Sequence, residues 1–166
     1  MEFAPKVCPI STALKIFYHA HIQPHIDFAS TVWDGASEAH LKPLNSLHRR
    51  AIKRVSDKNP EISTDDKFKQ LGILPLQKQL LFNKAVLMRK ITLSATPSYL
   101  TSMFRTTHTN SRTPRDSLVM PRPRRDIFMM SLSYSGAKVF NSLQEPVRTA
   151  QTINAFKARL QKHLLS

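Results

Sequence analysis

The sequence predicts an all-α protein, an irregular bundle of about five or six helices. Apolar residues recur at helical spacing along several stretches, and residues 75–94 are apolar on nearly every side of a helical axis. A helix of that kind is typical of the centre of a bundle. A hydrophobic fraction of 41% in 166 residues is enough for a packed core. We therefore expect a disordered lead-in at residues 1–10 and a single helical domain over residues 11–166.

The first expected helix begins at the Ser-Thr pair of residues 11–12, either of which can act as its N-cap. It runs to about residue 23, and Pro24 helps to end it because proline lacks a backbone donor. The following segment, HIDFASTVW at residues 25–33, alternates in polarity and is interpreted as extended. Pro24 and Trp33 are expected to be structural anchors of this region.

A second helix is expected from the N-cap Ser37 to Val55, with Glu38 in its first turn. At about 100° per residue its two faces differ strongly. Its apolar face consists of Leu41, Leu44, Leu47, Ala51, Ile52 and Val55. Its cationic face consists of Lys42, Arg49, Arg50, Lys53 and Arg54. We expect the first face to join the core and the second to stay in solvent.

The remaining helices are indicated by caps, stops and apolar stripes. A loop at residues 57–61 precedes a short helix capped by Thr64 and stopped by Gly72. The last helix is capped by Thr152 and places Phe156 on its inner stripe. The other helices are expected at residues 75–94, 97–104 and 137–143.

Residues 105–130 differ in character from the rest of the chain. Prolines alternate with arginines there, and proline fixes an extended path, so this segment is expected to be a long loop. It contains Arg105, Arg112, Arg115, Arg122, Arg124 and Arg125.

The charge balance indicates a polyanionic partner. Twenty-five basic and 11 acidic residues give a net charge of +14. The basic side chains repel one another unless a polyanion or counter-ions neutralise them. RNA or DNA is the expected partner, ahead of an acidic membrane surface, and we expect neither a membrane nor a small-molecule substrate. The cationic helix face would follow phosphates, and the arginines of the loop would add contacts. The alternative for both is a solvated surface without a partner.

No catalytic activity is expected. The single cysteine, Cys8, excludes an internal disulfide framework and favours an intracellular location, cytoplasmic or nuclear. No Gly-x-Ser-x-Gly motif is present. The adjacent carboxylates Asp65 and Asp66 follow a helix start, so they are interpreted as favourable first-turn charges, not as metal ligands.

Three histidines and an aspartate near the N-terminus are residue types that bind metal ions. His19, His21, His25 and Asp27 have suggestive spacing, but Pro24 interrupts a common helix face. No cofactor and no metal are therefore expected. Outside that cluster, His48 falls within the apolar arc of its helix and is interpreted as a core residue. Trp33 could stack on a base but is interpreted as a packing anchor.

The order of these segments resembles the C-terminal, post-palm region of reverse transcriptases from non-LTR, jockey-like retrotransposons. The likeness covers roughly residues 14–165. A segment of the form Tyr…Ile-x-Pro…Val-Trp corresponds to Tyr18, Ile22, Pro24, Ile26, Phe28, Val32 and Trp33. The helix pattern that follows corresponds to Leu44, Leu47, His48, Arg49, Arg50 and Ala51. Later matches are Ser111–Arg112, Val119–Pro121, Gly136–Leu143 and Phe156–Lys157.

Two positions depart from the pattern of this family. Phe140 stands where a tryptophan is usual, and is expected to act as an anchor together with Phe156. Gln144 and Glu145 precede Pro146 where Leu-Pro is expected. These departures suggest drift, as in an element copy that is no longer selected for transposition.

The resemblance implies a truncated fragment of an RNA-directed DNA polymerase. The palm aspartates that bind magnesium would lie before this chain, so polymerase chemistry is expected to be absent and non-specific RNA or DNA binding to remain. The alternatives are a helical module that docks on a missing polymerase core, and a decayed copy without function.

Overall fold

The computed structural model describes residues 10–56, 61–106 and 117–165. In these ranges the elements are helical, apart from an isolated antiparallel bridge between Thr106 and Leu118. The all-α prediction is therefore confirmed. The lead-in was predicted at residues 1–10; residues 1–9 and most of the predicted loop at 57–61 lie outside the described residues, whereas Ile10 is the first residue of α1. None of the helices within the described ranges is long and apolar enough to cross a membrane.

The chain divides into two compact units, where a single helical domain was predicted. Unit 1 consists of Met1–Phe28 and Ser37–Leu76, and unit 2 of Ala29–Ala36 and Gln77–Ser166. Each unit has its own cluster of buried apolar side chains. The two are described separately below.

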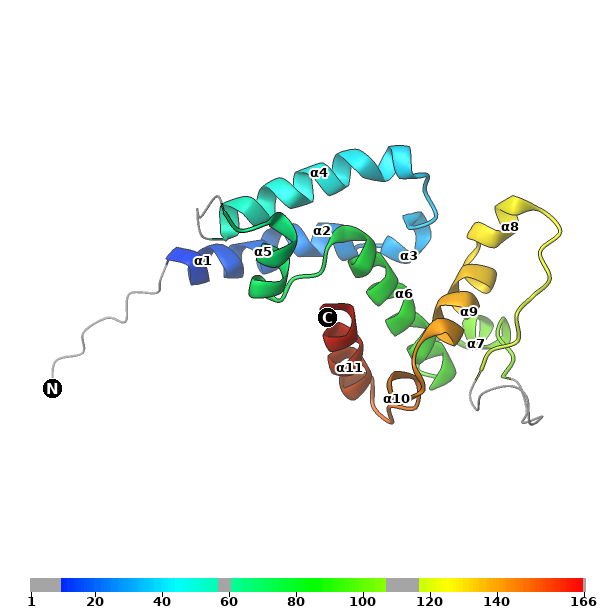
Figure 1. Cartoon of the computed structure of the whole chain (residues 1–166). Helices are drawn as coiled ribbons and strands as arrows, with labels where there is room; N and C mark the ends of the chain where they lie inside the picture. The colour runs from blue at the N-terminus through cyan, green and yellow to red at the C-terminus, as the bar shows by residue number, and fades with distance from the viewer. Residues whose placement is uncertain (1–9, 57–60, 107–116, 166) are drawn as a thin grey trace, which may run out of the picture. The chain divides into compact units, whose positions relative to one another are not determined.

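Unit 1 is a layer of two long helical segments with a short helix at one end (Figure 1). Its buried cluster consists of Tyr18, Ile52, Val55, Phe68 and Ile73. These residues come from the N-terminal segment, from α4 and from the region of α5, so the three pieces share one core. The elements are α1 (Ile10–Phe17), the π-helical turn η1 (Tyr18–Ile22), α2 (Gln23–Asp27), α4 (Glu38–Val55) and α5 (Thr64–Leu71).

Pro24 does not end the first helix, contrary to prediction. Helical backbone continues from residue 10 to residue 27, because a π-helical turn precedes the proline. In that turn the N–H of Gln23 donates to the carbonyl of Tyr18, five residues back. A proline inside a helix clashes with the carbonyl four residues before it. The wider π turn makes room for the ring, and Pro24 then occupies the first turn of α2, where a missing N–H is tolerated.

The prediction of an extended segment at residues 25–33 is wrong. Residues up to Asp27 belong to α2, and Ser30–Trp33 form α3. Ala29 separates the two helices with a left-handed conformation, φ 48°. Over so few residues an alternation of apolar and polar side chains does not distinguish a strand from short helical turns.

The predicted ends of α4 and α5 are confirmed, with one change of cap. Ser37 occupies the N-cap position of α4, and Gly72 ends α5 in the left-handed conformation, φ 68°. The N-cap of α5 is Ser63, not Thr64, because the hydroxyl of Ser63 accepts the N–H of Asp66 at 3.1 Å. The same hydroxyl donates to the carboxylate of Asp66 at 2.8 Å.

Unit 2 is organised around α6 (Leu76–Thr92), which belongs to it from Gln77 onward. Ala85, Met88 and Ile91 of this helix are almost fully buried, in agreement with its apolar pattern. They pack in a cluster with the fully buried Phe140 and Phe156. The other elements are α3, α7 (Ser98–Ser102), α8 (Asp126–Met130), α9 (Leu132–Ser142), α10 (Glu145–Arg148) and α11 (Ile153–Leu165).

Several elements of unit 2 differ from their predicted bounds. The expected helix at 137–143 begins earlier, at Leu132, and α10 was not predicted. The cap of α11 is confirmed, since the hydroxyl of Thr152 accepts the N–H of Ala155 at 3.2 Å. The loop predicted at 105–130 contains α8, so that prediction is wrong for its last five residues. Asp126 stands in the first turn of α8, where a carboxylate favours helix formation.

Candidate nucleic-acid interface

The apolar and the cationic side chains of α4 lie on two different faces of the helix. His48, Ile52 and Val55 are buried in the core of unit 1. Four of the five predicted cations of this helix are exposed: Lys42, Arg50, Lys53 and Arg54. Because residues three or four apart are neighbours on a helix, Arg50, Lys53 and Arg54 form one compact cationic group. Such a group can contact several phosphates at once.

Arg49, the fifth cation, is engaged within unit 1. Its guanidinium donates to the carboxylate of Asp65 at 2.9 Å, which links α4 to the start of α5. The side chains are 40% and 67% exposed, so water screens the pair strongly. Arg49 therefore has less charge available for a phosphate than its neighbours do. The pair also gives Asp65 a structural partner besides its favourable place in the first turn of α5.

The arginines of residues 105–130 belong to unit 2. Arg122, Arg124 and Arg125 are exposed, and Arg112 and Arg115 lie outside the described residues. The segment that carries the exposed arginines is held at Leu118, which is buried. The side-chain amide of Asn141 accepts the N–H of Leu118 and donates to its carbonyl, both at 2.8 Å.

A buried Tyr–His pair joins η1 to α4. The phenol oxygen of Tyr18 and Nε2 of His48 are 2.7 Å apart, and the two residues are 1% and 2% exposed. His48 also meets Phe68 edge-on, with ring centres 5.1 Å apart. Burial lowers the pKa of His48 from 6.5 to about 4, although the charge of Asp27 acts in the opposite direction. Burial also raises the pKa of Tyr18 above its ordinary value, and Asp27 adds to this effect.

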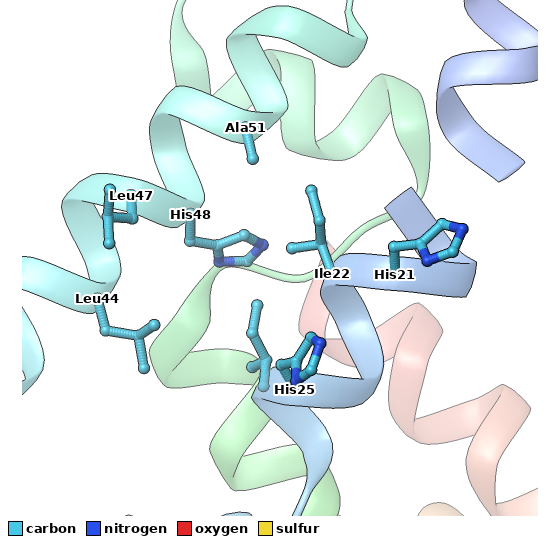
Figure 2. A pocket seen from close by; sticks show the side chains of 8 residues that line it. His21, Ile22, His25, Leu44, Leu47, His48 and Ala51 are labelled. Carbon is cyan, nitrogen blue, oxygen red and sulfur yellow. The ribbon is translucent and has the colours of Figure 1, made fainter. Parts of the chain in front are cut away.

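A pocket of about 290 Å³ adjoins this pair between α4 and the η1–α2 segment. Figure 2 shows Leu44, His48 and Ala51 of α4 facing the opposite helical segment across it. The remaining lining residues are His21, Ile22, His25, Ile26 and Leu47. The walls are mostly aliphatic, with imidazole rings from both helical segments.

The histidines that suggested a metal site serve in other contacts. Nδ1 of His19 lies 3.1 Å from the side-chain oxygen of Gln23, and His21 stacks obliquely on Phe17 with ring centres 4.6 Å apart. His25 lines the pocket. Among the described residues, no group of three or more His, Cys, Asp or Glu side chains is placed to hold a metal ion.

The four predicted anchors differ in environment. Phe140 and Phe156 are fully buried in the core of unit 2. Trp33 is half-buried on α3, and Pro24 is exposed on α2.

Sequence reasoning missed the pocket and a buried ion pair. Nζ of Lys84 lies 2.5 Å from the carboxylate of Asp34 and donates to the hydroxyl of Ser135 at 3.0 Å. The side chains of Lys84 and Asp34 are only 9% and 6% exposed. The sequence did not single out Lys84, because Lys78 and Lys90 lie within the same helix at 75–94.

Comparisons with protein-family models, with curated proteins and with solved structures gave no match to this chain.

Proposed function

We propose that this chain binds RNA or DNA through the phosphate backbone, with the exposed cations of α4 as its main contacts. The observation that supports this proposal is the arrangement of α4. Its buried arc fixes the helix in unit 1, and Arg50, Lys53 and Arg54 remain together in solvent on the other arc. A net charge of +14 strengthens the attraction at long range.

The arginines at residues 122–125 are the second set of proposed contacts. Arg122, Arg124 and Arg125 are exposed on a segment whose start is clamped by Asn141. Guanidinium groups suit phosphate oxygens because they present planar pairs of donors. Their segment contains prolines, which limit the entropy lost when it is ordered on a ligand.

The proposed origin is the post-palm region of a non-LTR retrotransposon reverse transcriptase, without polymerase chemistry. The motif residues quoted above carry this proposal. Three of them, Gly136, Phe140 and Leu143, are buried in unit 2, as expected of positions that a fold restricts. Phe140 fills its core position with an aromatic ring, as the tryptophan of the family pattern would.

A matched pair of triple variants tests the proposal. Arg50→Gln/Lys53→Gln/Arg54→Gln removes three charges from α4 and is expected to weaken binding and to flatten its salt dependence. Three lost phosphate contacts reduce the slope of log affinity against log salt by about 3 on duplex DNA. The control, Lys138→Gln/Lys157→Gln/Lys162→Gln, removes the same charge from exposed positions on α9 and α11.

Filter-binding titrations at two salt concentrations measure both quantities. If the two triple variants lose affinity equally, net charge alone drives binding and the assignment to α4 is wrong. Unchanged affinity in both would reject nucleic-acid binding through these surfaces.

A second candidate function is docking on a protein, such as the polymerase core of a related element. The exposed apolar side chains of α8 favour it, because Ile127 and Met130 are 76% and 59% exposed. Contiguous apolar surface of this kind often marks an interface. The variant Ile127→Lys/Met130→Lys should abolish co-elution with such a core and leave nucleic-acid binding unchanged. Co-elution of this variant at the wild-type level would reject α8 as the docking surface.

A further inference from the structure

We infer that the pocket between α4 and the η1–α2 segment takes an unpaired nucleobase while the adjoining cations of α4 hold its phosphate. This inference rests on the proposed function and names its substrate class, a single-stranded nucleic acid. Leu47 and Ala51 line the pocket, and Arg50 and Arg54 follow them by three residues each. Residues at that spacing are neighbours on a helix surface, so the cations stand beside the pocket.

The size of the pocket fits a base. A cavity of about 150 Å³ accepts benzene. The volume here, about 290 Å³, therefore accommodates a flat ring system of one or two rings. The pocket is partly open, so the sugar and phosphate of a bound nucleotide can stay outside it.

The chemistry of the walls also fits a base better than a purely apolar ligand. Imidazole rings are flat and stack on bases as other aromatic side chains do. His25 supplies such a ring at the pocket, and Ile22 supplies an aliphatic surface beside it. No carboxylate stands among the lining residues, although the charge of Asp27 acts on His48 of the wall.

His48 contributes a buried imidazole ring to the same pocket. It lines the pocket and is only 2% exposed. Its Nε2 faces Tyr18, whereas its Nδ1 has no hydrogen-bond partner within the described part of the chain. A buried polar atom without a partner costs free energy. Nδ1 is itself inaccessible to solvent, so the fit of a base depends on the ring of His48 and not on this atom.

The test compares a single strand with the same strand made of abasic nucleotides, using the full-length protein. The two probes share their phosphates and differ in their bases. Base stacking predicts that the wild-type protein binds the intact strand between about fivefold and about a hundredfold more tightly. Equal affinity for the two strands would overturn the inference and leave the proposed backbone binding intact. Failure to bind either strand would overturn both.

A pocket-filling variant locates the effect. Ala51→Phe places a ring inside the pocket and is expected to remove the preference for the intact strand, with affinity for the abasic strand unchanged. Ala39→Phe is the matched control, because Ala39 is exposed on the same helix and does not line the pocket. If Ala51→Phe retains the full preference, the base lies elsewhere and the inference fails.

A second variant covers the case in which Ala51→Phe does not fold, as judged by circular dichroism. His25 is exposed, so His25→Ala leaves the core of unit 1 unchanged. It should reduce the preference for the intact strand severalfold without affecting the abasic strand. An unchanged preference in His25→Ala would contradict a base stacked in this pocket.

Discussion

The phenol oxygen of Tyr18 lies 2.7 Å from Nε2 of His48, in the interior of unit 1. Thirty residues separate the two in sequence, and their hydrogen bond ties the π-helical turn η1 to α4. The helix that carries the proposed contacts is therefore held by a polar bond as well as by apolar packing.

We predict that Tyr18→Phe destabilises unit 1 by about 1–3 kcal/mol, because it leaves both ring nitrogens of His48 buried without a partner. Chemical denaturation followed by circular dichroism measures the change. Tyr134→Phe is the control, since Tyr134 is only half-buried and belongs to α9 of unit 2. A Tyr18→Phe protein as stable as the wild type would show that the hydrogen bond contributes nothing.

We predict that stability is greatest between about pH 6.5 and pH 10 and falls on both sides. His48 has a pKa of about 4 in the folded protein against 6.5 in the unfolded chain, so the unfolded chain binds a proton first as the pH falls. Stability therefore decreases from pH 6.5 to about pH 4, by roughly 3 kcal/mol in total. Above pH 10.0 the unfolded chain loses the proton of Tyr18 first, because burial raises the pKa of that phenol in the fold.

Thermal unfolding as a function of pH checks this prediction, with His48→Gln as the test variant and His40→Gln as the exposed control. His48→Gln should be less stable at neutral pH but should lose much of the slope on the acid side. The same acid slope in His48→Gln as in the wild type would assign it to other groups.

We predict that removing one partner of the buried ion pair of unit 2 lowers the free energy of unfolding strongly, whereas replacing both partners by apolar residues lowers it little. Lys84→Met leaves the carboxylate of Asp34 buried without its charge partner and should cost about 3–5 kcal/mol. The double variant Lys84→Met/Asp34→Leu removes both charges and should recover most of that loss. Denaturant unfolding of the two proteins provides the comparison. A double variant as unstable as the single one would show that the pair itself stabilises the fold.

We predict that Gly136→Ala destabilises unit 2 by about 1–3 kcal/mol, although alanine is the better helix former. A Cβ at this position of α9 would lie 2.6 Å from Sδ of Met88. Met88 is fully buried, so its sulfur has little room to move. Combining the change with Met88→Ala should relieve the clash, and thermal unfolding can measure the coupling between the two sites. Additive effects would show that the two residues do not press on one another.

We predict that Asp65→Asn increases nucleic-acid affinity about two- to fivefold and changes stability by less than about 1 kcal/mol. The substitution removes the partner of Arg49, which then adds one cation to the exposed group on α4. Asp66→Asn is the control for the charge change, because Asp66 serves the cap of α5. Equal gains in affinity from both variants would indicate a general charge effect without a role for Arg49.

The local features of the fold could be predicted because their causes lie within a few residues. The N-cap position of Ser37 and the left-handed stop at Gly72 follow from the conformations that these residues prefer. The burial of Ile52 and Val55 follows from helical spacing, although Leu47 of the same predicted face is 60% exposed. The central place of α6 in unit 2 follows from its apolar residues. The cap of α5 was misplaced by one residue, since Ser63 and Thr64 are both residue types that cap helices.

The sequence by itself determined which face of α4 is apolar, where that helix begins and ends, and that its cations stand apart from its core residues. Only the tertiary structure decided that His48 meets Tyr18, that Lys84 meets Asp34, and that a pocket opens beside Ala51. The physical reason is that periodicity specifies that a side chain is buried but not what it is buried against. Partners far apart in sequence are chosen by the packing of whole helices, which no short pattern encodes.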